Sequence, residues 1–275
     1  MFSVKEKHII ITGAGGVIGS TIAVSLAKAG ARLTILDLNG DKLKITEDRI
    51  NAFGKKNLAF TCDVFDLENL EKVKNKVRNE SDRIDGLLNV AGGATKGAST
   101  RTEFMTSETA PEDSFFGVSL KDFHTTSDLN FMGSVIPIKV FGEVMAQQQS
   151  GNIINISSMG AIRPLTKSPA YCAGKAAITN FTLWLAVHLS KSNIRVNAIA
   201  PGFFLTEQNR FLLVDENSGE FTPRGKRIIE HTPLGKLGDP EQLVSTLFWL
   251  LSDQSSFITG TIIPVDGGFS AYNGI

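Results

Sequence analysis

Disulfides, clustered metal ligands and any excess of charge are lacking in this chain of 275 residues. Its two cysteines, Cys62 and Cys172, lie in different predicted elements, so we expect no disulfide framework. Lys plus Arg and Asp plus Glu each total 28, and the resulting formal net charge of zero offers no basic surface to nucleic acid. No group of His, Cys and Asp has the spacing of metal ligands, which predicts a protein that needs no metal.

Long apolar runs and a leader segment are also lacking. No apolar run reaches the ~18 residues that a membrane span needs, so we expect no membrane partner. The start of the chain runs directly into a strand-like sequence at 8–11, which leaves no room for a signal peptide. Because 42% of the residues are hydrophobic, the chain can bury a substantial core, and we expect one domain over residues 1–275. We also expect the protein to be cytoplasmic and its two thiols to be reduced.

Short apolar runs alternate with longer amphipathic segments throughout the sequence. Strands are predicted at 8–11, 32–36, 58–61, 86–89, 152–156, 195–198 and 261–265, and helices at about 17–29, 40–53, 66–80, 119–148, 170–191 and 240–252. Continuous Val/Ile/Leu strands separated by helices are typical of a parallel sheet covered on both faces. The predicted fold class is therefore α/β with a doubly wound parallel sheet.

Two connections are too long to be simple turns. One runs from residue 92 to about 120, and the other from about 203 to 239. Long irregular segments in compact domains are usually lids or binding loops. Ligands of open α/β sheets bind beyond the carboxyl ends of the strands, where both segments begin. We expect residues 203–239 to form a lid over the substrate cleft.

A glycine-rich turn follows the first predicted strand. Residues 12–19 read Thr-Gly-Ala-Gly-Gly-Val-Ile-Gly and open a helix, whose N-terminus can hold a pyrophosphate. The second strand ends at Asp37, whose carboxylate can accept hydrogen bonds from both ribose hydroxyls and would repel a 2′-phosphate. No arginine follows it directly, so NAD is favoured over NADP. Asp63 and Asn89, at the ends of the next two strands, are either nucleotide contacts or ordinary turn residues.

The stretch 157–175 carries the clearest chemical signal. Tyr171 and Lys175 lie four apart at the start of a predicted helix, so both project from one face. Ser158 lies 13 residues upstream of Tyr171, just past a predicted strand. A free tyrosine titrates near ~10, and a nearby lysine cation is expected to lower that pKa. A phenol, an ammonium and a hydroxyl that converge here suit proton transfer to a carbonyl oxygen.

In their order and spacing these motifs resemble the short-chain dehydrogenase/reductase family over nearly the whole chain. The matching pieces also include Asn130, the run Asn-Ala-Ile-Ala-Pro-Gly at 197–202 and Asp-Gly-Gly at 266–268. The resemblance implies a Rossmann-type seven-stranded sheet and hydride transfer between a nicotinamide and a carbonyl or alcohol. The chain departs from the family at Val17, where glycine is usual, and this bears on the phosphate contacts.

The resemblance also implies roles for single residues. Tyr171 would be the general acid/base, and Lys175 would bind the nicotinamide ribose and tune Tyr171. Ser158, which fits the family spacing where Ser157 does not, would position the reacting oxygen. Asn130 would hold a helix and a proton-relay water. The implied NAD contacts are Gly13, Gly15, Gly16, Val17, Ile18, Gly19, Asp37, Asp63, Val64, Asn89, Ala91, Gly92, Tyr171, Lys175, Pro201, Gly202, Phe204 and Thr206.

Within the family, the loop sequences most resemble the D-mannonate oxidoreductase (fructuronate reductase) group. This implies NADH-linked interconversion of D-fructuronate and D-mannonate, with Lys96, Arg163 and Arg210 as candidate cations for a sugar acid. The null hypothesis for each cation is a solvated surface residue. The alternatives are a gluconate-type or 3-ketoacyl reductase, for which Phe203 and Phe204 could line an apolar cleft, or a non-catalytic NAD sensor.

The resemblance further implies a homotetramer. The predicted helices at 119–148 and 170–191 would pack against their copies, and residues 265–272 would complete a second interface.

Overall fold

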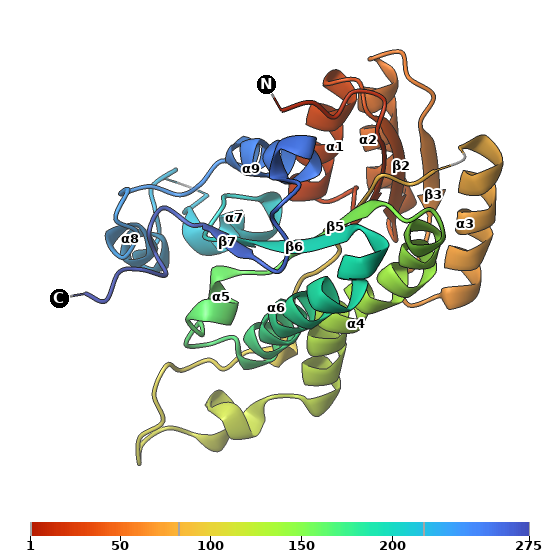
Figure 1. The fold of residues 1–275 in the computed structure, drawn as a ribbon. Coiled ribbons are helices and arrows are strands. Elements are labelled where there is room, and N and C mark those ends of the chain that lie inside the picture. Colours follow the sequence, from red (N-terminus) through yellow and green to blue (C-terminus); the bar gives the residue numbers. More distant parts are fainter. Residues whose placement is uncertain (1, 82, 217, 275) are drawn as a thin grey trace.

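Within residues 2–81, 83–216 and 218–274, which the computed structural model describes, seven parallel strands form one sheet in the order β3-β2-β1-β4-β5-β6-β7 (Figure 1). The order reverses between β1 and β4, whose last residues, Thr12 and Asn89, lie side by side. This is the position where open α/β sheets bind ligands. The strands are β1 (His8–Thr12), β2 (Arg32–Asp37), β3 (Leu58–Thr61), β4 (Gly86–Asn89), β5 (Gly151–Ile156), β6 (Ile194–Pro201) and β7 (Ile262–Val265).

Helices cover both faces of the sheet, and the predicted doubly wound α/β fold is confirmed. β1 shows why, since Ile9 and Ile11 pack into one helical layer and Ile10 into the other. One layer contains α1 (Val17–Lys28), α2 (Gly40–Asn51) and α9 (Val244–Leu251), and the other α3 (Leu67–Glu80), α4 (Leu120–Gln147) and α6 (Pro169–Leu189). Short 3-10 helices lie at η4 (Ser190–Ser192), η5 (Pro240–Leu243) and η6 (Asp253–Ser255).

α4 is long and apolar enough to cross a membrane by length and composition, although its sequence has no unbroken apolar run. An 18-residue window of α4 has a mean hydropathy of 1.2, and 56% of that window is buried within the protein. α4 packs against α6, β4 and β5. Its composition is therefore that of a core helix.

The two long connections hold helices that the sequence did not predict. The first, called here the arm (residues 93–119), contains η1 (Lys96–Ala98), η2 (Pro111–Asp113) and η3 (Phe115–Gly117), and it projects from the body in Figure 1. The lid (residues 203–239) contains α7 (Glu207–Leu213) and α8 (Pro223–Glu230). A further short helix, α5 (Met159–Ile162), lies between β5 and α6.

The lid is internally packed and its two ends meet. A Cβ on Gly225 would lie 2.4 Å from the Leu213 carbonyl oxygen, so α7 and α8 approach closely at this glycine. At the lid root, Phe204 and Gly238 form a β-bridge, and the Gly238 N–H donates to the Phe203 carbonyl at 2.8 Å. The two ends of the lid are therefore joined at this root.

α4 and α6 cross in close contact at Gly174. A Cβ there would lie 2.8 Å from the Ser127 carbonyl oxygen and 2.9 Å from the Cβ of Asn130. A larger residue would therefore push α4 away from α6 at the point where Asn130 and Lys175 face each other.

We predict that Gly174→Ala destabilises the protein whereas Gly142→Ala does not. Overpacking costs about 1–3 kcal/mol, and the gain in helix propensity returns ~1 kcal/mol. The net cost of up to about 2 kcal/mol should therefore lower the melting temperature of Gly174→Ala by up to roughly 4–8 °C. At Gly142, within α4, the new Cβ would meet Ile138 and Ile153 at 3.7 and 3.8 Å, which are ordinary contacts. Thermal unfolding of both variants checks this, and equal stability would contradict it.

Candidate active site

The turn after β1 is shaped by two glycines that accept no side chain. Gly13 has a φ of +66°, and a Cβ on it would lie 2.7 Å from the Ala91 Cα. A Cβ on Gly19 would lie 2.1 Å from the Gly13 carbonyl oxygen. Thr12 Oγ1 accepts the Val90 and Ala91 N–H groups at 3.2 and 3.3 Å. The chain after β4 therefore passes directly across the glycine-rich turn.

Val17 fits this turn without needing the freedom of glycine. Gly16 is the N-cap of α1 with an extended backbone, and Val17 is the first helical residue. Val17 is not among the described residues with positive φ, so its conformation is one that any residue adopts. Val17 and Ile18 are partly buried, and Ile18 packs against the core.

Asp37 at the end of β2 faces the same turn. Its Oδ2 accepts the Gly15 N–H at 2.8 Å, and its Oδ1 accepts the Asn39 N–H at 2.8 Å. Each oxygen keeps a lone pair for a further donor. Leu38 is 70% exposed and carries no charge, while Lys42 packs beside Gly15 with its Cβ 3.0 Å from the position of a Gly15 Cβ.

Asn89 and Val64, which are both predicted to contact the cofactor, point their side chains into the protein. Asn89 is 1% exposed, and its Nδ2 donates to Asn155 Oδ1 at 2.8 Å. Val64 is buried and packs beside Gly133 on α4. Their backbones alone are left to face a nucleotide. Asp63 is partly exposed, with one carboxylate oxygen accepting the Phe65 N–H at 2.9 Å.

Ser158 and Tyr171 come together at the carboxyl end of β5. Ser158 caps α5, its Oγ accepting the Gly160 N–H at 3.0 Å, and it is hydrogen-bonded to the Tyr171 phenol. The neighbouring Ser157 turns the other way, with its Oγ 2.5 Å from Thr179 Oγ1. The geometry thus places Ser158, and not Ser157, beside the tyrosine.

Lys175 and Asn130 lie behind Tyr171. Lys175 is 4% exposed, its Nζ lies 5.8 Å from the centre of the Tyr171 ring, and it donates to the Ile156 carbonyl at 2.6 Å. Asn130 is fully buried and donates to the Gly93 carbonyl at 2.6 Å. A Cβ on Gly92 would lie 3.0 Å from Asn130 Oδ1 and 3.3 Å from Lys175 Nζ, so this glycine keeps the space between them open.

The predicted direction of the Tyr171 pKa shift is wrong for this structure. Burial raises the pKa of the phenol, and the hydrogen bond with Ser158 opposes that rise. The same dry surroundings lower the pKa of Lys175 to about 8. Desolvation therefore outweighs the attraction that the lysine was expected to exert.

The end of β6 leads to the lid. The Gly202 N–H donates to the Val265 carbonyl at 3.0 Å, and a Cβ on Gly202 would lie 2.6 Å from the Asp266 Cα. Pro201 is buried as the last residue of β6, and Thr206 is the N-cap of α7, its N–H donating to Asn209 Oδ1 at 2.8 Å. These contacts fix the start of the lid against the end of β7.

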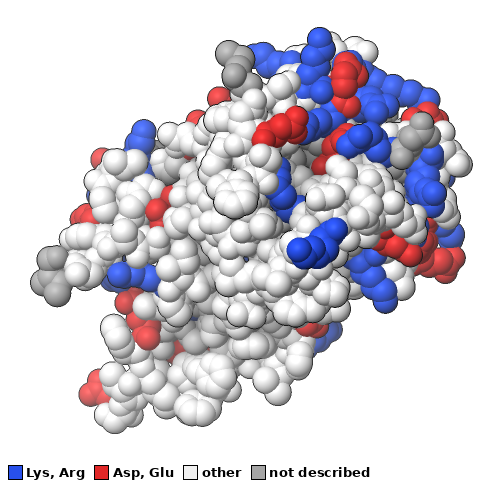
Figure 2. Space-filling view, viewed as in Figure 1, with Lys and Arg blue, Asp and Glu red and all other residues white. Residues whose placement is uncertain are grey.

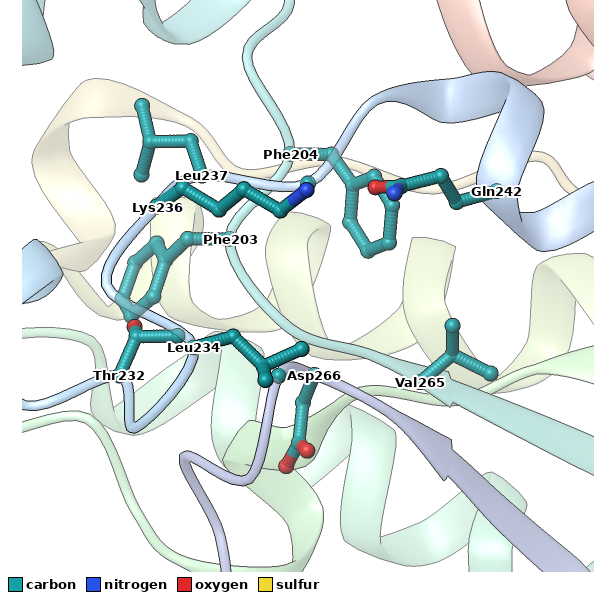
Figure 3. Close-up of a pocket in the computed structure, with 11 residues that line it drawn as sticks. Phe203, Phe204, Thr232, Leu234, Lys236, Leu237, Gln242, Val265 and Asp266 are labelled. Carbon is teal, nitrogen blue, oxygen red and sulfur yellow. The ribbon is translucent and has the colours of Figure 1, made fainter.

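Phe204, predicted to contact the cofactor, packs its ring on Gly238 at the lid root, where a Gly238 Cβ would lie 2.5 Å from it. A cavity of about 150 Å³ opens there (Figure 3). Ser158, Tyr171 and Lys175 are not among the described residues that line it. The cavity is lined by Phe203, Phe204, Thr232, Leu234, Lys236, Leu237, Gly238, Gln242, Val265, Asp266 and Gly267.

The three candidate cations differ in their surroundings. Arg163 Nη1 donates to the Tyr272 carbonyl at 2.6 Å. Lys96 and Arg210 are exposed, and among the described residues neither forms an ion pair. Much of the centre of the face in Figure 2 carries no charge, whereas Lys and Arg gather toward the α2–α3 end.

Comparisons with known proteins agree with this architecture. A family model described as Enoyl-(Acyl carrier protein) reductase matches residues 13–270. The chain is 44% identical over 271 residues to the uncharacterized oxidoreductase UxuB of Bacillus subtilis, covering 98% of this chain and 96% of that protein. It is 32% identical over 269 residues to the NAD-dependent glycerol dehydrogenase of Listeria innocua, covering 98% and 96%.

A solved structure is similar along the same length. It is that of a Haemophilus influenzae protein provisionally assigned as a D-mannonate oxidoreductase, with bound NAD. The TM-score is 0.93 and the identity is 43%, with 99% of this chain and 98% of that chain covered.

We predict that Lys175→Met stabilises the protein near neutral pH. Below pH 8 the folded state must bury a charged ammonium, because its pKa of about 8 lies below the ~10.4 of an unfolded lysine. This cost shrinks as the pH rises from about 8 towards ~10.4, since the folded lysine then loses its proton first. Lys175→Met also loses the hydrogen bond to the Ile156 carbonyl, which offsets part of this gain. The melting temperature should therefore rise by roughly 3–6 °C at pH 7 and by less at pH 9.5.

The matched control is Lys139→Met, which removes an exposed lysine from the middle of α4. It should change the melting temperature little at either pH. A Lys175→Met protein that melts below wild type at pH 7 would contradict the assigned cost.

Proposed function

Because this chain belongs to the short-chain dehydrogenase/reductase family, we propose that it interconverts a keto-sugar acid and its alcohol with NAD(H), namely D-fructuronate and D-mannonate. The chemistry rests on one observation, the Tyr171 phenol hydrogen-bonded to Ser158 with Lys175 behind it. The choice of substrate is supported by the 43% identity to the provisional D-mannonate oxidoreductase.

NAD fits the residues at the ends of β1 and β2. Gly13 and Gly19 leave the backbone bare at the turn, and the N-terminus of α1 faces it with Gly16 as its cap. The Asp37 carboxylate keeps acceptor capacity for the two ribose hydroxyls. The solved relative with 43% identity binds NAD over a chain of the same fold.

The protein residues handle the proton and the orientation of the substrate. Bound NAD(H) supplies or accepts the hydride at the reacting carbon. Ser158 donates a hydrogen bond to the substrate oxygen and fixes it against the phenol of Tyr171. In reduction Tyr171 gives its proton to that oxygen, and in oxidation it takes the proton back. Lys175 steadies the phenolate that forms after reduction.

The raised pKa of Tyr171 favours reduction at neutral pH. The phenol is then protonated, which is the form that donates to a carbonyl oxygen. Oxidation of the alcohol requires the phenolate, so we expect its rate to climb with pH. Reduction should lose rate as the phenol loses its proton at alkaline pH.

The substrate carboxylate needs a cation, and we rank Arg210 first. It lies on the lid helix α7, it is exposed, and no ion pair among the described residues occupies it. Arginine grips a carboxylate with two parallel N–H groups. Lys96 is the second choice, and Arg163 the third because it already holds the Tyr272 carbonyl.

An acyl thioester is the second candidate substrate. The cavity at the lid root has apolar walls that include Phe203, Phe204 and Leu237. The matching family model is also described as Enoyl-(Acyl carrier protein) reductase, a name that refers to acyl thioesters. This alternative needs a path from that cavity to Tyr171, and a sugar acid does not.

We also propose that the protein works as a cytoplasmic homotetramer. The outer face of α6 supports this, because Trp184 is 56% and Val187 77% exposed. Trp184 is stacked between Phe181 and His188, which holds it flat against the helix. Exposed apolar side chains on a long helix are typical of an interface.

We predict that wild type prefers NADH and that Asp37→Ser with Leu38→Arg shifts the preference towards NADPH. Loss of the charge-assisted contacts should lower kcat/KM for NADH by about ten- to a hundredfold. Asp41→Ser, which removes another acid four residues further along, is the control and should leave the ratio unchanged. Initial rates with both cofactors decide this, and a wild type that prefers NADPH would contradict it.

The substrate is tested by NADH oxidation with D-fructuronate, an uncharged keto-sugar and a 3-ketoacyl thioester, with Tyr171→Phe as the inactive reference. We predict that Arg210→Gln lowers kcat/KM for D-fructuronate about ten- to a hundredfold and affects the uncharged sugar much less. Arg49→Gln, on an exposed part of α2, is the charge-matched control. Reduction of the thioester without reduction of any sugar acid would refute the proposed substrate.

A further inference from the structure

The lid helix α8 is held at two points by parts of the chain distant in sequence. Arg227 Nη1 lies 2.5 Å from Glu103 Oε1, which is on the arm. Just beyond the helix, the His231 ring packs edge-on against the Tyr272 ring with 6.3 Å between centroids. The lid is therefore attached to the arm at one point and to the C-terminal tail at the other.

On the arm side, the attachment leads to the segment before α6. The Thr100 N–H donates to the Lys167 carbonyl at 3.0 Å, and Lys167 Nζ donates to the Arg101 carbonyl at 2.7 Å. Lys167 lies four residues before Tyr171. The base of the arm is thus fixed to the segment that delivers the phenol.

On the tail side, the attachment leads to the same segment. Arg163, which ends α5, donates to the Tyr272 carbonyl at 2.6 Å. The residues between α5 and α6 join Ser158 to Tyr171. Both attachments of α8 therefore end on the stretch that connects these two residues.

Glu103 is presented from a firm part of the arm. The Arg101 and Thr102 N–H groups both donate to the Asp113 carbonyl, at 3.0 and 3.1 Å, and Arg101 also pairs with the Asp113 carboxylate at 2.9 Å. The Glu103 side chain is 31% exposed, whereas that of Arg227 is 63% exposed. A carboxylate held by the arm thus faces a cation on the lid.

We propose that Glu103 and Arg227 are positioning residues whose ion pair holds the lid closed against the arm, beside the segment that joins Ser158 to Tyr171. The inference rests on the oxidoreductase function proposed above. An exposed pair shifts an equilibrium by at most about fivefold, which is little for the whole fold. A lid whose open and closed states are near balance responds to such a shift, because the ratio of closed to open molecules changes by this factor.

The first experiment measures the lid without any substrate. Amide hydrogen exchange across residues 223–230 is compared in wild type, Arg227→Gln, Glu103→Gln and the charge-swapped pair Glu103→Arg/Arg227→Glu, each as the full chain with and without NAD. The control is Lys226→Gln, since the neighbouring Lys226 pairs with Glu220 inside the lid at 3.6 Å. We expect exchange up to about fivefold faster in both single variants, and near wild type in the swap and the control.

The second experiment measures turnover with whichever substrate the enzyme reduces. Arg227→Gln and Glu103→Gln should raise KM by up to about fivefold with little loss of kcat, and the swap should restore KM. In 1 M salt, where the Debye length is ~3 Å, wild type should approach the single variants. A merely structural role would not give salt dependence or rescue by reversed charges.

The outcomes separate this proposal from the proposed function. Unchanged exchange in the single variants, or no rescue by the swap, would overturn the lid contact even if D-fructuronate is the substrate. Faster exchange restored by the swap would support the contact even if another carbonyl compound proves to be the substrate.

Discussion

The buried ammonium of Lys175 is the group that constrains the rest of the catalytic end. A buried charge costs several kcal/mol unless it is paired or hydrogen-bonded. Here the compensating acceptor is the Ile156 carbonyl at 2.6 Å, which the parallel strand β5 presents at its carboxyl end. Gly174 lets α4 pack tightly on α6 next to Lys175, and Gly92 leaves room beside the ammonium. The carboxyl end of β5, the close crossing of α4 and α6 and the space beside Gly92 therefore together surround this one ammonium.

The same dryness decides the acid–base properties of the site. Burial pushes the phenol of Tyr171 toward its neutral form and lowers the pKa of Lys175 to about 8, so it disfavours the charged form of both groups while Lys175 stays an ammonium at neutral pH. Sequence spacing could place the two side chains on one helix face, but it could not show how much water surrounds them. The sign of the Tyr171 shift was missed because the spacing reports distance and not solvation.

Most of the fold was predictable because local pattern and tertiary burial agree. The strand that begins at His8 has Ile on both faces, and this pattern predicts a sheet that is covered by helices on both sides. The glycines of the turn were predictable too, because Gly13 and Gly19 meet backbone atoms that no side chain could share. Val17 looked like a departure, yet its helical backbone never required glycine.

Several contacts that position predicted site residues come from distant parts of the chain. Asn155 on the neighbouring strand draws the Asn89 side chain into the core, which leaves its backbone for the predicted cofactor contact. Nothing in the local sequence around Arg163 indicates that Tyr272, 109 residues later, occupies its guanidinium. The lid helices were missed for a similar reason, since their shared core is small and includes Leu213, Val214 and Ile228.

That small core also explains how a mobile lid can serve a rigid site. Ser158 caps α5 and Tyr171 lies on α6, which the sheet and α4 support, whereas α7 and α8 share only a small core with each other. Few buried contacts give a segment a low free energy of opening. The contact between Arg227 on the lid and Glu103 on the arm is exposed and polar, so it can be broken and remade without disturbing the fold. A weak contact between α8 and the arm thus suits a lid that must open to admit a substrate to a buried site.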